Sequence, residues 1–270
     1  MHELTHHSVI AALLQRHGLA PDKRFGQNFL VDSSVITSSL AAAEVGLADT
    51  VLEVGPGLGV LTRELLARAE HVHAIEFDER LQPVLHETLG TPSNLTVHWQ
   101  DATTFAWDTL PVGTKLVANL PYNVATTLLI DMLETQRFAS LTALVQLEVA
   151  ERLLATPGSK AYGALSLVTA MYATGRIVKR VPPGAFFPPP KVTSAIVHLV
   201  PNPAVQPNPT LRKVIQRGFA HRRKTLQKNL LMAGYEKHRV TQALVGFVPQ
   251  VRAEQLSLAE FQTLTNRLYS

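Results

Sequence analysis

The fold is decided by the stretch Val51-Leu52-Glu53-Val54-Gly55-Pro56-Gly57-Leu58-Gly59. Its first four residues predict a buried strand, the glycines predict a tight turn, and the apolar positions from Leu61 to Ala69 predict a helix. This order is typical of the first unit of a doubly wound α/β sheet, in which a nucleotide-like ligand binds at the carboxyl end of the strand. A purely structural glycine turn is the alternative interpretation.

The alternation of strands and helices continues along the chain. Further strands are predicted at His71–Ile75, at Leu95–Trp99, before Asn119 and at Ile196–Val200, and an apolar run lies at Leu141–Leu147. Helices are predicted in residues 1–20, after an N-cap at Asp32, and at Glu79–Leu89, Thr126–Thr135 and Glu148–Ala155. We therefore expect an α/β fold with a parallel, Rossmann-like sheet.

The expected domain boundary is the proline-rich segment 201–209, after which the pattern is entirely helical. We expect a large domain over 1–200, including an N-terminal helix and lid over 1–30, and a small helical domain over 210–270. Residues 210–270 contain 11 Lys and Arg against 3 Asp and Glu, a net charge of +8, whereas residues 1–209 carry −4. This asymmetry favours a polyanionic partner bound mainly at one end, with a merely solvated basic face as the alternative.

Composition excludes several classes of protein. No apolar run approaches 18 residues, which argues against a membrane span, and no secretory signal is visible at the N-terminus. The chain has no cysteine, which excludes disulfides, thiol catalysis and Cys-ligated zinc. The 11 histidines show no spacing typical of metal ligands, and we expect a cytoplasmic protein without a metal site.

Polar side chains follow three of the predicted strands. Glu76 comes 21 residues after Gly55, the usual place for a carboxylate that binds ribose hydroxyls. Asp101 is a candidate acceptor for an adenine amino group, or simply a helix N-cap. Because parallel strands end at one rim of the sheet, Glu76, Asp101 and Asn119 should lie along it. The third glycine comes one residue early for a dinucleotide fingerprint, which disfavours a nicotinamide oxidoreductase.

The four residues Asn119-Leu120-Pro121-Tyr122 suit an exocyclic amine on a flat ring. The side-chain carbonyl of Asn119 accepts one N–H, and Pro121 biases Leu120 toward an extended conformation that aims its backbone carbonyl at a second. Tyr122 offers a ring face for stacking. Two acceptors on one amine favour a nucleophilic nitrogen. An ordinary strand followed by a proline turn is the alternative.

Taken in order, the glycine loop, Glu76, Asp101 and the Asn119–Tyr122 quartet resemble the S-adenosylmethionine-dependent adenine-N6 methyltransferases. More narrowly, the chain resembles the small-subunit ribosomal RNA adenine dimethyltransferase family, the kasugamycin-sensitivity methyltransferases. The resemblance covers nearly the whole length and includes the segments 26–30, 145–153, 157–163, 181–192 and 222–226.

The resemblance implies a role for individual residues. It implies that S-adenosylmethionine is bound by Asn28, Leu30, Gly55, Glu76, Asp101 and Asn119. It implies that Asn119, Leu120 and Tyr122 act at the target amine, and that Phe186 is a second aromatic ring against the target base. Arg222, Arg223 and Lys224 would bind the RNA backbone. The chain departs from the family pattern at Gln100 and Phe187, and neither departure removes a catalytic group.

The resemblance also implies the reaction and the partner. We expect transfer of methyl groups to N6 of two adjacent adenosines near the 3′ end of small-subunit (16S) rRNA, in a precursor of the 30S subunit, by a monomer. The sulfonium is already an activated electrophile, so the expected chemistry needs no metal. Two rivals stay open: a large-subunit methyltransferase of the macrolide-resistance type, and a non-catalytic ribosome-assembly factor.

Overall fold

The computed structural model describes residues 3–22 and 26–270, so residues 23–25 of the expected lid lie outside the described part. The chain divides into two compact units, which are treated separately below. Unit 1 comprises Met1–Ala150 and Gly175–Pro201, and unit 2 comprises Glu151–Thr174 and Asn202–Ser270. The expected boundary near residue 200 is thus only part of the division, because residues 151–174 belong to the C-terminal unit.

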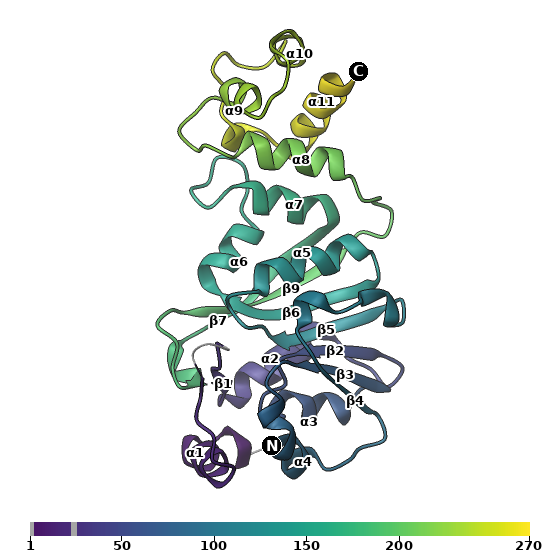
Figure 1. Ribbon diagram of the computed structural model, residues 1–270, viewed down its shortest axis with the longest axis vertical. Coiled ribbons are helices and arrows are strands. Elements are labelled where there is room, and N and C mark those ends of the chain that lie inside the picture. The colour runs from purple at the N-terminus through teal and green to yellow at the C-terminus, as the bar shows by residue number, and fades with distance from the viewer. Residues whose placement is uncertain (1–2, 23–25) are drawn as a thin grey trace. The chain divides into compact units, whose positions relative to one another are not determined.

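Unit 1 is built on a seven-stranded sheet with the strand order β4-β3-β2-β5-β6-β9-β7 (Figure 1). The strands are β2 (Thr50–Val54), β3 (His71–Glu76), β4 (Leu95–Trp99), β5 (Thr114–Asn119), β6 (Phe138–Gln146), β7 (Ala173–Val181) and β9 (Ser194–Pro201). From β4 to β6 the neighbours are parallel, and β9 is antiparallel to β6. The doubly wound α/β fold predicted from the sequence is confirmed.

Helices cover both faces of this sheet. The helices of unit 1 are α1 (His7–Arg16), α2 (Ser33–Ala43), α3 (Val60–Leu66), α4 (Gln82–Leu89) and α5 (Ala125–Thr135). Apolar side chains of α2 and α3 pack on the sheet to form one core, and α5 packs against β6 on the other side (Figure 1). The predicted N-cap of α2 is confirmed, since the Asp32 side chain accepts a hydrogen bond from the Ser34 backbone N–H at 2.8 Å.

A second, two-stranded sheet joins distant parts of unit 1. It pairs β1 (Phe29–Leu30) with β8 (Phe186–Phe187) in antiparallel fashion. Leu30 and Phe186 contribute to the core under α2, whereas Phe29 and Phe187 pack with the apolar residues of α1. Side chains alternate between the two sides of a strand, which explains this division.

Unit 2 is mostly helical. Its helices are α7 (Ala164–Tyr172), α8 (Pro209–Gly218), α9 (Leu226–Met232), α10 (Lys237–Ala243) and α11 (Leu258–Tyr269), and α6 (Leu147–Leu153) crosses the boundary between the units. The ring of Phe219 lies between those of Tyr162 and Phe261, with centroid distances of 6.2 and 5.9 Å. Residues 151–174 belong to this unit because α7 contacts both α8 and α11.

None of the described helices is long and apolar enough to cross a membrane.

Candidate active site

The candidate site is a cavity of about 200 Å³ in unit 1, at the carboxyl ends of the parallel strands. It is lined by the glycine loop after β2, by Glu76 at the end of β3, by Asp101 after β4 and by Asn119 to Tyr122 after β5. Asn28 and Leu30, from the segment that contains β1, also line it. The structure therefore brings together the rim residues that were predicted from strand ends.

The glycine loop owes its shape to backbone conformations that other residues rarely adopt. Gly55 and Gly57 have φ angles of +74° and +57°. A Cβ atom on Gly57 would come within 3.1 Å of the Phe29 ring, and one on Gly55 would lie 3.8 Å from Pro121. The loop is thus packed between β1 and the segment after β5, and its glycines permit that close approach.

The carboxylate of Glu76 stabilises the glycine loop by hydrogen bonds to backbone N–H groups. One carboxylate oxygen accepts the backbone N–H of Gly57 at 3.1 Å, and the other accepts that of Asp78 at 2.9 Å. The side chain is buried, and burial raises the pKa of Glu76 despite these two hydrogen bonds. Each carboxylate oxygen has two acceptor positions, so Glu76 can still accept hydrogen bonds from a ligand in the cavity.

A second buried carboxyl group, that of Glu53, lines the same cavity. Glu53 is 2% exposed, and its Oε2 atom has no hydrogen-bond partner among the described residues. Burial raises its pKa to about 8, and the nearby charge of Glu76 adds to the effect. No role was predicted for Glu53 from the sequence, although its place before the first glycine was visible.

The side-chain amide of Asn119 is oriented by the N-terminal segment. Its Nδ2 atom donates a hydrogen bond to the backbone carbonyl of Asn28 at 3.1 Å, while the Asn28 side chain donates to the Gly26 carbonyl at 3.0 Å. Because the amino group of Asn119 is used in this way, its carbonyl oxygen remains as an acceptor. The structure places Asn28 at this site, in contact with Asn119, and its role in binding the cofactor stays a prediction.

Asp101 is exposed, unlike Asn28, Glu76 and Asn119. Its Oδ1 atom accepts hydrogen bonds from both the backbone N–H and the hydroxyl of Thr103, each at 2.8 Å. Asp101 therefore caps the 3-10 helix Ala102–Thr104 and also lines the cavity. The two interpretations that the sequence left open are compatible in the structure.

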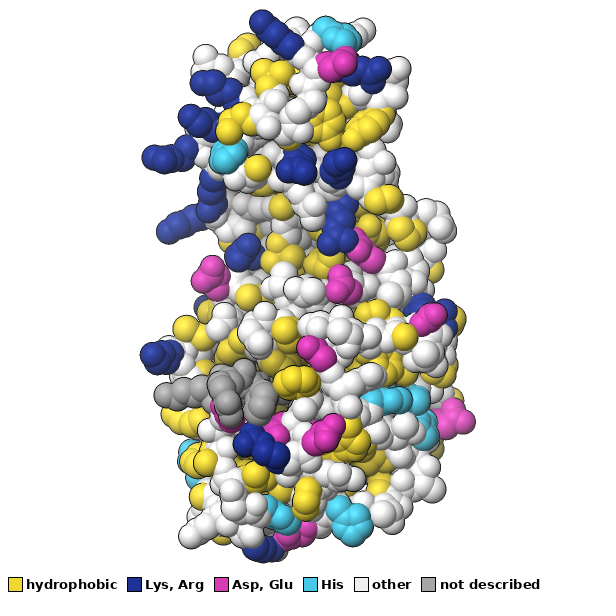
Figure 2. Space-filling model, in the orientation of Figure 1, with side chains coloured by type: hydrophobic (Ala, Val, Ile, Leu, Met, Phe, Trp, Pro, Cys, Tyr) yellow, Lys and Arg dark blue, Asp and Glu magenta, His cyan; other side chains and the backbone are white. Residues whose placement is uncertain are grey.

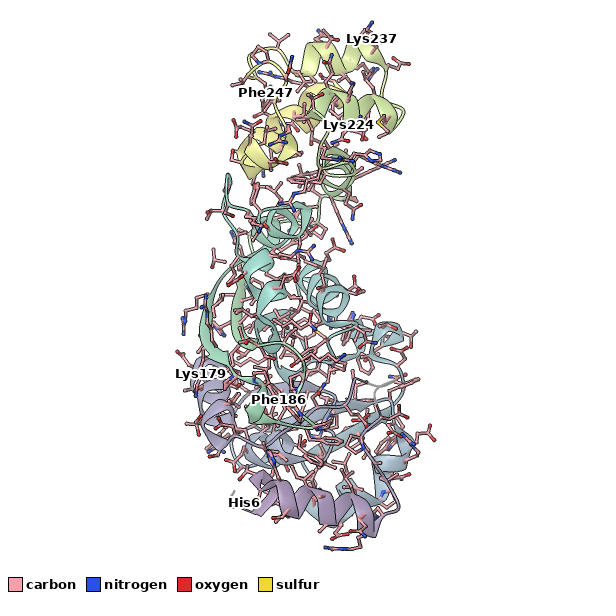
Figure 3. All side chains as sticks on the ribbon, turned by 90° about the vertical axis from the view of Figure 1, so that its left-hand side faces the viewer. His6, Lys179, Phe186, Lys224, Lys237 and Phe247 are labelled. Atoms are coloured by element: carbon pink, nitrogen blue, oxygen red, sulfur yellow. The ribbon has the colours of Figure 1, made fainter. Side chains whose placement is uncertain are left out.

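Phe186 is the exception among the predicted site residues. Figure 3 labels Phe186 on its ribbon. The side chain is completely buried beside Leu30 in the core under α2, and it does not line the cavity. The cause is the pairing of β8 with β1, which turns Phe186 toward the sheet and Phe187 toward α1. The structure offers no exposed face of Phe186 on which a base can stack, which corrects the prediction.

Other cavity residues were not predicted from the sequence. Gln27 lines the cavity and donates from Nε2 to Asp78 at 2.8 Å, which ties the lid segment to the residues after Glu76. Phe77, directly after Glu76, is 58% exposed and also lines the cavity. The signal that could have found both is their position, next to Asn28 and to Glu76 respectively.

The predicted RNA-binding residues lie in unit 2, where Lys and Arg side chains gather over the surface (Figure 2). All three of Arg222, Arg223 and Lys224 are exposed. Arg222, however, donates a hydrogen bond to the backbone carbonyl of Lys160 at 2.6 Å. It thereby joins the loop before α9 to the loop before α7, whereas Arg223 and Lys224 carry no such contact among the described residues.

No group of three or more His, Asp or Glu side chains in residues 3–22 and 26–270 is arranged to hold a metal ion.

Comparison with known proteins identifies the family to which this chain belongs. Residues 20–269 match the family model described as Ribosomal RNA adenine dimethylase. The Ribosomal RNA small subunit methyltransferase A of Deinococcus radiodurans is 44% identical over 262 residues, which are 96% of this chain and 89% of that protein. The protein of the same name from Magnetococcus marinus is 42% identical, over 97% of each chain.

Two solved structures are similar over most of their length. A dimethyladenosine transferase from Plasmodium falciparum has a TM-score of 0.72 and 26% identity, over 87% of this chain and 95% of that one. The 23S rRNA methyltransferase ErmE has a TM-score of 0.68 and 29% identity, over 90% of this chain and all of that one. Together with the family match over nearly the full length, these similarities show that the chain belongs to the ribosomal RNA adenine dimethylase family.

Proposed function

We propose that this enzyme transfers methyl groups from S-adenosylmethionine to N6 of two adjacent adenosines near the 3′ end of small-subunit rRNA, giving N6,N6-dimethyladenosine. We infer that it does so in the cytoplasm, as a monomer, on a precursor of the 30S subunit. The observation that carries the chemistry is the oriented amide of Asn119, which leaves a carbonyl oxygen as acceptor at the rim of the cavity.

The cavity suits S-adenosylmethionine. Buried Glu53 lines the cavity, and the carboxylate of Glu76 can accept ribose hydroxyls. The loop at Gly55 allows a ligand to approach the backbone closely. We assign the cofactor to Asn28, Leu30, Gly55, Glu76, Asp101 and Asn119, and we add Glu53.

The proposed catalysis is mainly positioning. When bound, the cofactor supplies an electrophilic methyl group. The carbonyl oxygens of Asn119 and Leu120 accept the two N–H groups of the target amine, and the ring of Tyr122 stacks on the unpaired base. As the amine takes the methyl group it becomes positively charged, and the two carbonyl dipoles stabilise that charge. The released proton goes to water, so no residue is assigned as a general base.

Substrate choice is supported by the relatives. The proteins that are 44% and 42% identical are small-subunit methyltransferases by name, whereas the large-subunit enzyme ErmE is 29% identical. The basic surface of unit 2 suits recognition of folded RNA through its backbone. In this proposal, unit 2 binds the RNA through Arg223 and Lys224, and unit 1 carries out the transfer.

The experiment is methyl transfer from labelled S-adenosylmethionine to unmethylated small subunits, with large subunits and naked 16S rRNA in parallel. The product is mapped by nuclease digestion and mass spectrometry. Dimethyladenosine in small-subunit RNA alone is expected. Label in large-subunit RNA would favour the resistance-type activity, and tight binding of subunits without any label would favour an assembly factor.

A further inference from the structure

The hydroxyl group of Tyr122 makes a contact that the proposed chemistry does not use. Its oxygen lies 2.6 Å from the hydroxyl oxygen of Ser194. Ser194 is the first residue of β9 and is completely buried, whereas Tyr122 is half-buried and lines the cavity. The separation is at the short end of the range for hydrogen bonds between two hydroxyl groups.

Ser194 is a fixed point for this contact. It pairs with Gln146 of β6, and the carbonyl of the preceding residue, Thr193, accepts the backbone N–H of Leu147 at 2.9 Å. Backbone hydrogen bonds therefore hold the chain on both sides of the serine hydroxyl. A group with so little freedom can hold a partner in one orientation.

Burial raises the pKa of Tyr122, so its phenol is protonated and neutral at neutral pH. A neutral phenol is not a base for the target amine. The hydroxyl therefore serves as an attachment at the far end of the ring, while the ring face remains available to the cavity.

The attachment matters because the ring rotates about two side-chain bonds. A hydrogen bond at the hydroxyl end fixes the far end of the ring and so restricts rotation about the Cα–Cβ bond before any base arrives, and such preorganisation lowers the entropic cost of forming a reactive complex. Asn119, three residues earlier, is anchored independently by the carbonyl of Asn28. The amine acceptor and the stacking ring are thus each held by a separate part of unit 1.

We propose that Ser194 is a positioning residue, which holds the ring of Tyr122 at the place in the site where it can stack on the target adenine. This inference rests on the function proposed above, in which Tyr122 stacks on that base. Ser194 does not line the cavity, so it acts through Tyr122 alone.

The test is a double-mutant cycle with Ser194→Ala, Tyr122→Phe and the double variant. Each single change removes one partner of the same hydrogen bond, and each should lower kcat/KM for RNA about 5- to 20-fold, mostly through kcat. The double variant should be no worse than the poorer single variant, because the same bond is absent in all three. The affinity for S-adenosylmethionine should not change in any of them.

A second measurement needs no activity. In protein with ¹³Cζ-labelled tyrosine, NMR titration gives the phenol pKa of Tyr122, with the Tyr122→Phe spectrum as assignment. Ser194→Ala should raise this pKa, because the serine hydroxyl no longer stabilises the phenolate. A variant that merely loosens the fold would not shift Tyr122 in this direction.

Thr142→Val is the matched control. It removes another buried hydroxyl of the same strand pair, which lies 2.8 Å from Nδ1 of His198, well along the strands from Ser194. It should lower stability and leave both the Tyr122 pKa and kcat/KM unchanged. Additive losses in the cycle, or an unchanged Tyr122 pKa in Ser194→Ala, would overturn the proposal. A wild-type protein that transfers no methyl group would instead refute the proposed function.

Discussion

The side-chain amide of Asn119 donates a hydrogen bond to the backbone carbonyl of Asn28, 91 positions earlier in the chain, at 3.1 Å. A residue at the end of β5 is thereby oriented by the segment that leads into β1. The bond decides which end of the amide is available to a substrate, and it makes the two ends of the Asn119 side chain separately testable.

Asn119→Ala removes the acceptor and the donor together, and it should lower kcat by about 100-fold or more. Asn119→Asp keeps an acceptor but places a carboxylate beside the Asn28 carbonyl, so it should also lose most activity. Single-turnover methyl transfer measures both, and filter binding should show nearly unchanged RNA affinity. Asn266→Ala, at an exposed position of α11, is the control. Full turnover by Asn119→Ala would remove this residue from the mechanism.

Glu76→Gln should weaken cofactor binding at least about 10-fold, because a neutral amide accepts hydrogen bonds less strongly than a carboxylate. The same change weakens the support of the glycine loop at Gly57. Calorimetric titration with S-adenosylmethionine, together with a melting curve, separates a fall in affinity from a fall in stability. Glu79→Gln, a nearby exposed change, should bind normally, and an unaltered Kd for Glu76→Gln would refute the ribose role.

Among the three basic residues Arg222, Arg223 and Lys224 of unit 2, two should bind RNA and one should stabilise the fold. Arg223→Ala and Lys224→Ala, as single variants, should each reduce the salt dependence of RNA binding, by a slope of about 0.7 to 0.9 for each phosphate that the protein no longer neutralises. Arg222→Ala should instead lower the stability of unit 2, because Arg222 bonds to the Lys160 carbonyl. Binding measured at several salt concentrations distinguishes the two. An equal change of slope in all three single variants would contradict this division.

Glu53 should make stability depend on pH. Its pKa is about 8 in the folded protein and near 4.5 when exposed, so the folded state binds more protons between these values. The free energy of unfolding should therefore fall as pH rises from 4.5 to 8, by up to about 1.4 kcal/mol for each pH unit. Denaturant titrations at several pH values should show that Glu53→Gln lacks this pH dependence of the free energy of unfolding. Parallel pH profiles for the wild type and Glu53→Gln would contradict the role of Glu53.

The neighbouring histidines of β3 and β4 should have the opposite effect. Nδ1 of His73 lies 3.1 Å from Nε2 of His98, and burial with the neighbouring imidazoles lowers the pKa of His73 to about 4. The unfolded chain then binds more protons, so stability should be lost as pH falls from about 6.5 to 4. His73→Gln should be less sensitive to acid than the wild type, with exposed His86→Gln as control. Equal acid midpoints for all three would count against this explanation.

The sequence predicts the features of this fold that depend on local pattern. The apolar runs mark β2 to β6, and the residues that end these strands mark the cavity. Strand β7 was not predicted, because this edge strand carries Arg176, Lys179 and Arg180 where an inner strand has apolar residues. An edge strand has only one neighbour, so its burial pattern is weak.

Contacts between distant segments could not be predicted from the local sequence pattern. The burial of Phe186 follows from its pairing with Leu30, and no property of residues 186–187 alone shows which ring faces the core. The bond of Arg222 to Lys160 likewise joins two loops that are 62 residues apart. In both cases the surroundings of the side chain, and not its residue type, decide what it contacts.

The discontinuity of unit 2 has a consequence for synthesis. Residues 151–174 emerge from the translating ribosome well before α8 and α11, the helices that α7 contacts. During elongation, the apolar side of α7 therefore stays uncovered until α8 and α11 have been synthesised. The parallel strands β2 to β6 are complete before that point. A chain that ends early leaves this surface exposed, so premature termination should yield an aggregation-prone product instead of a functional fragment.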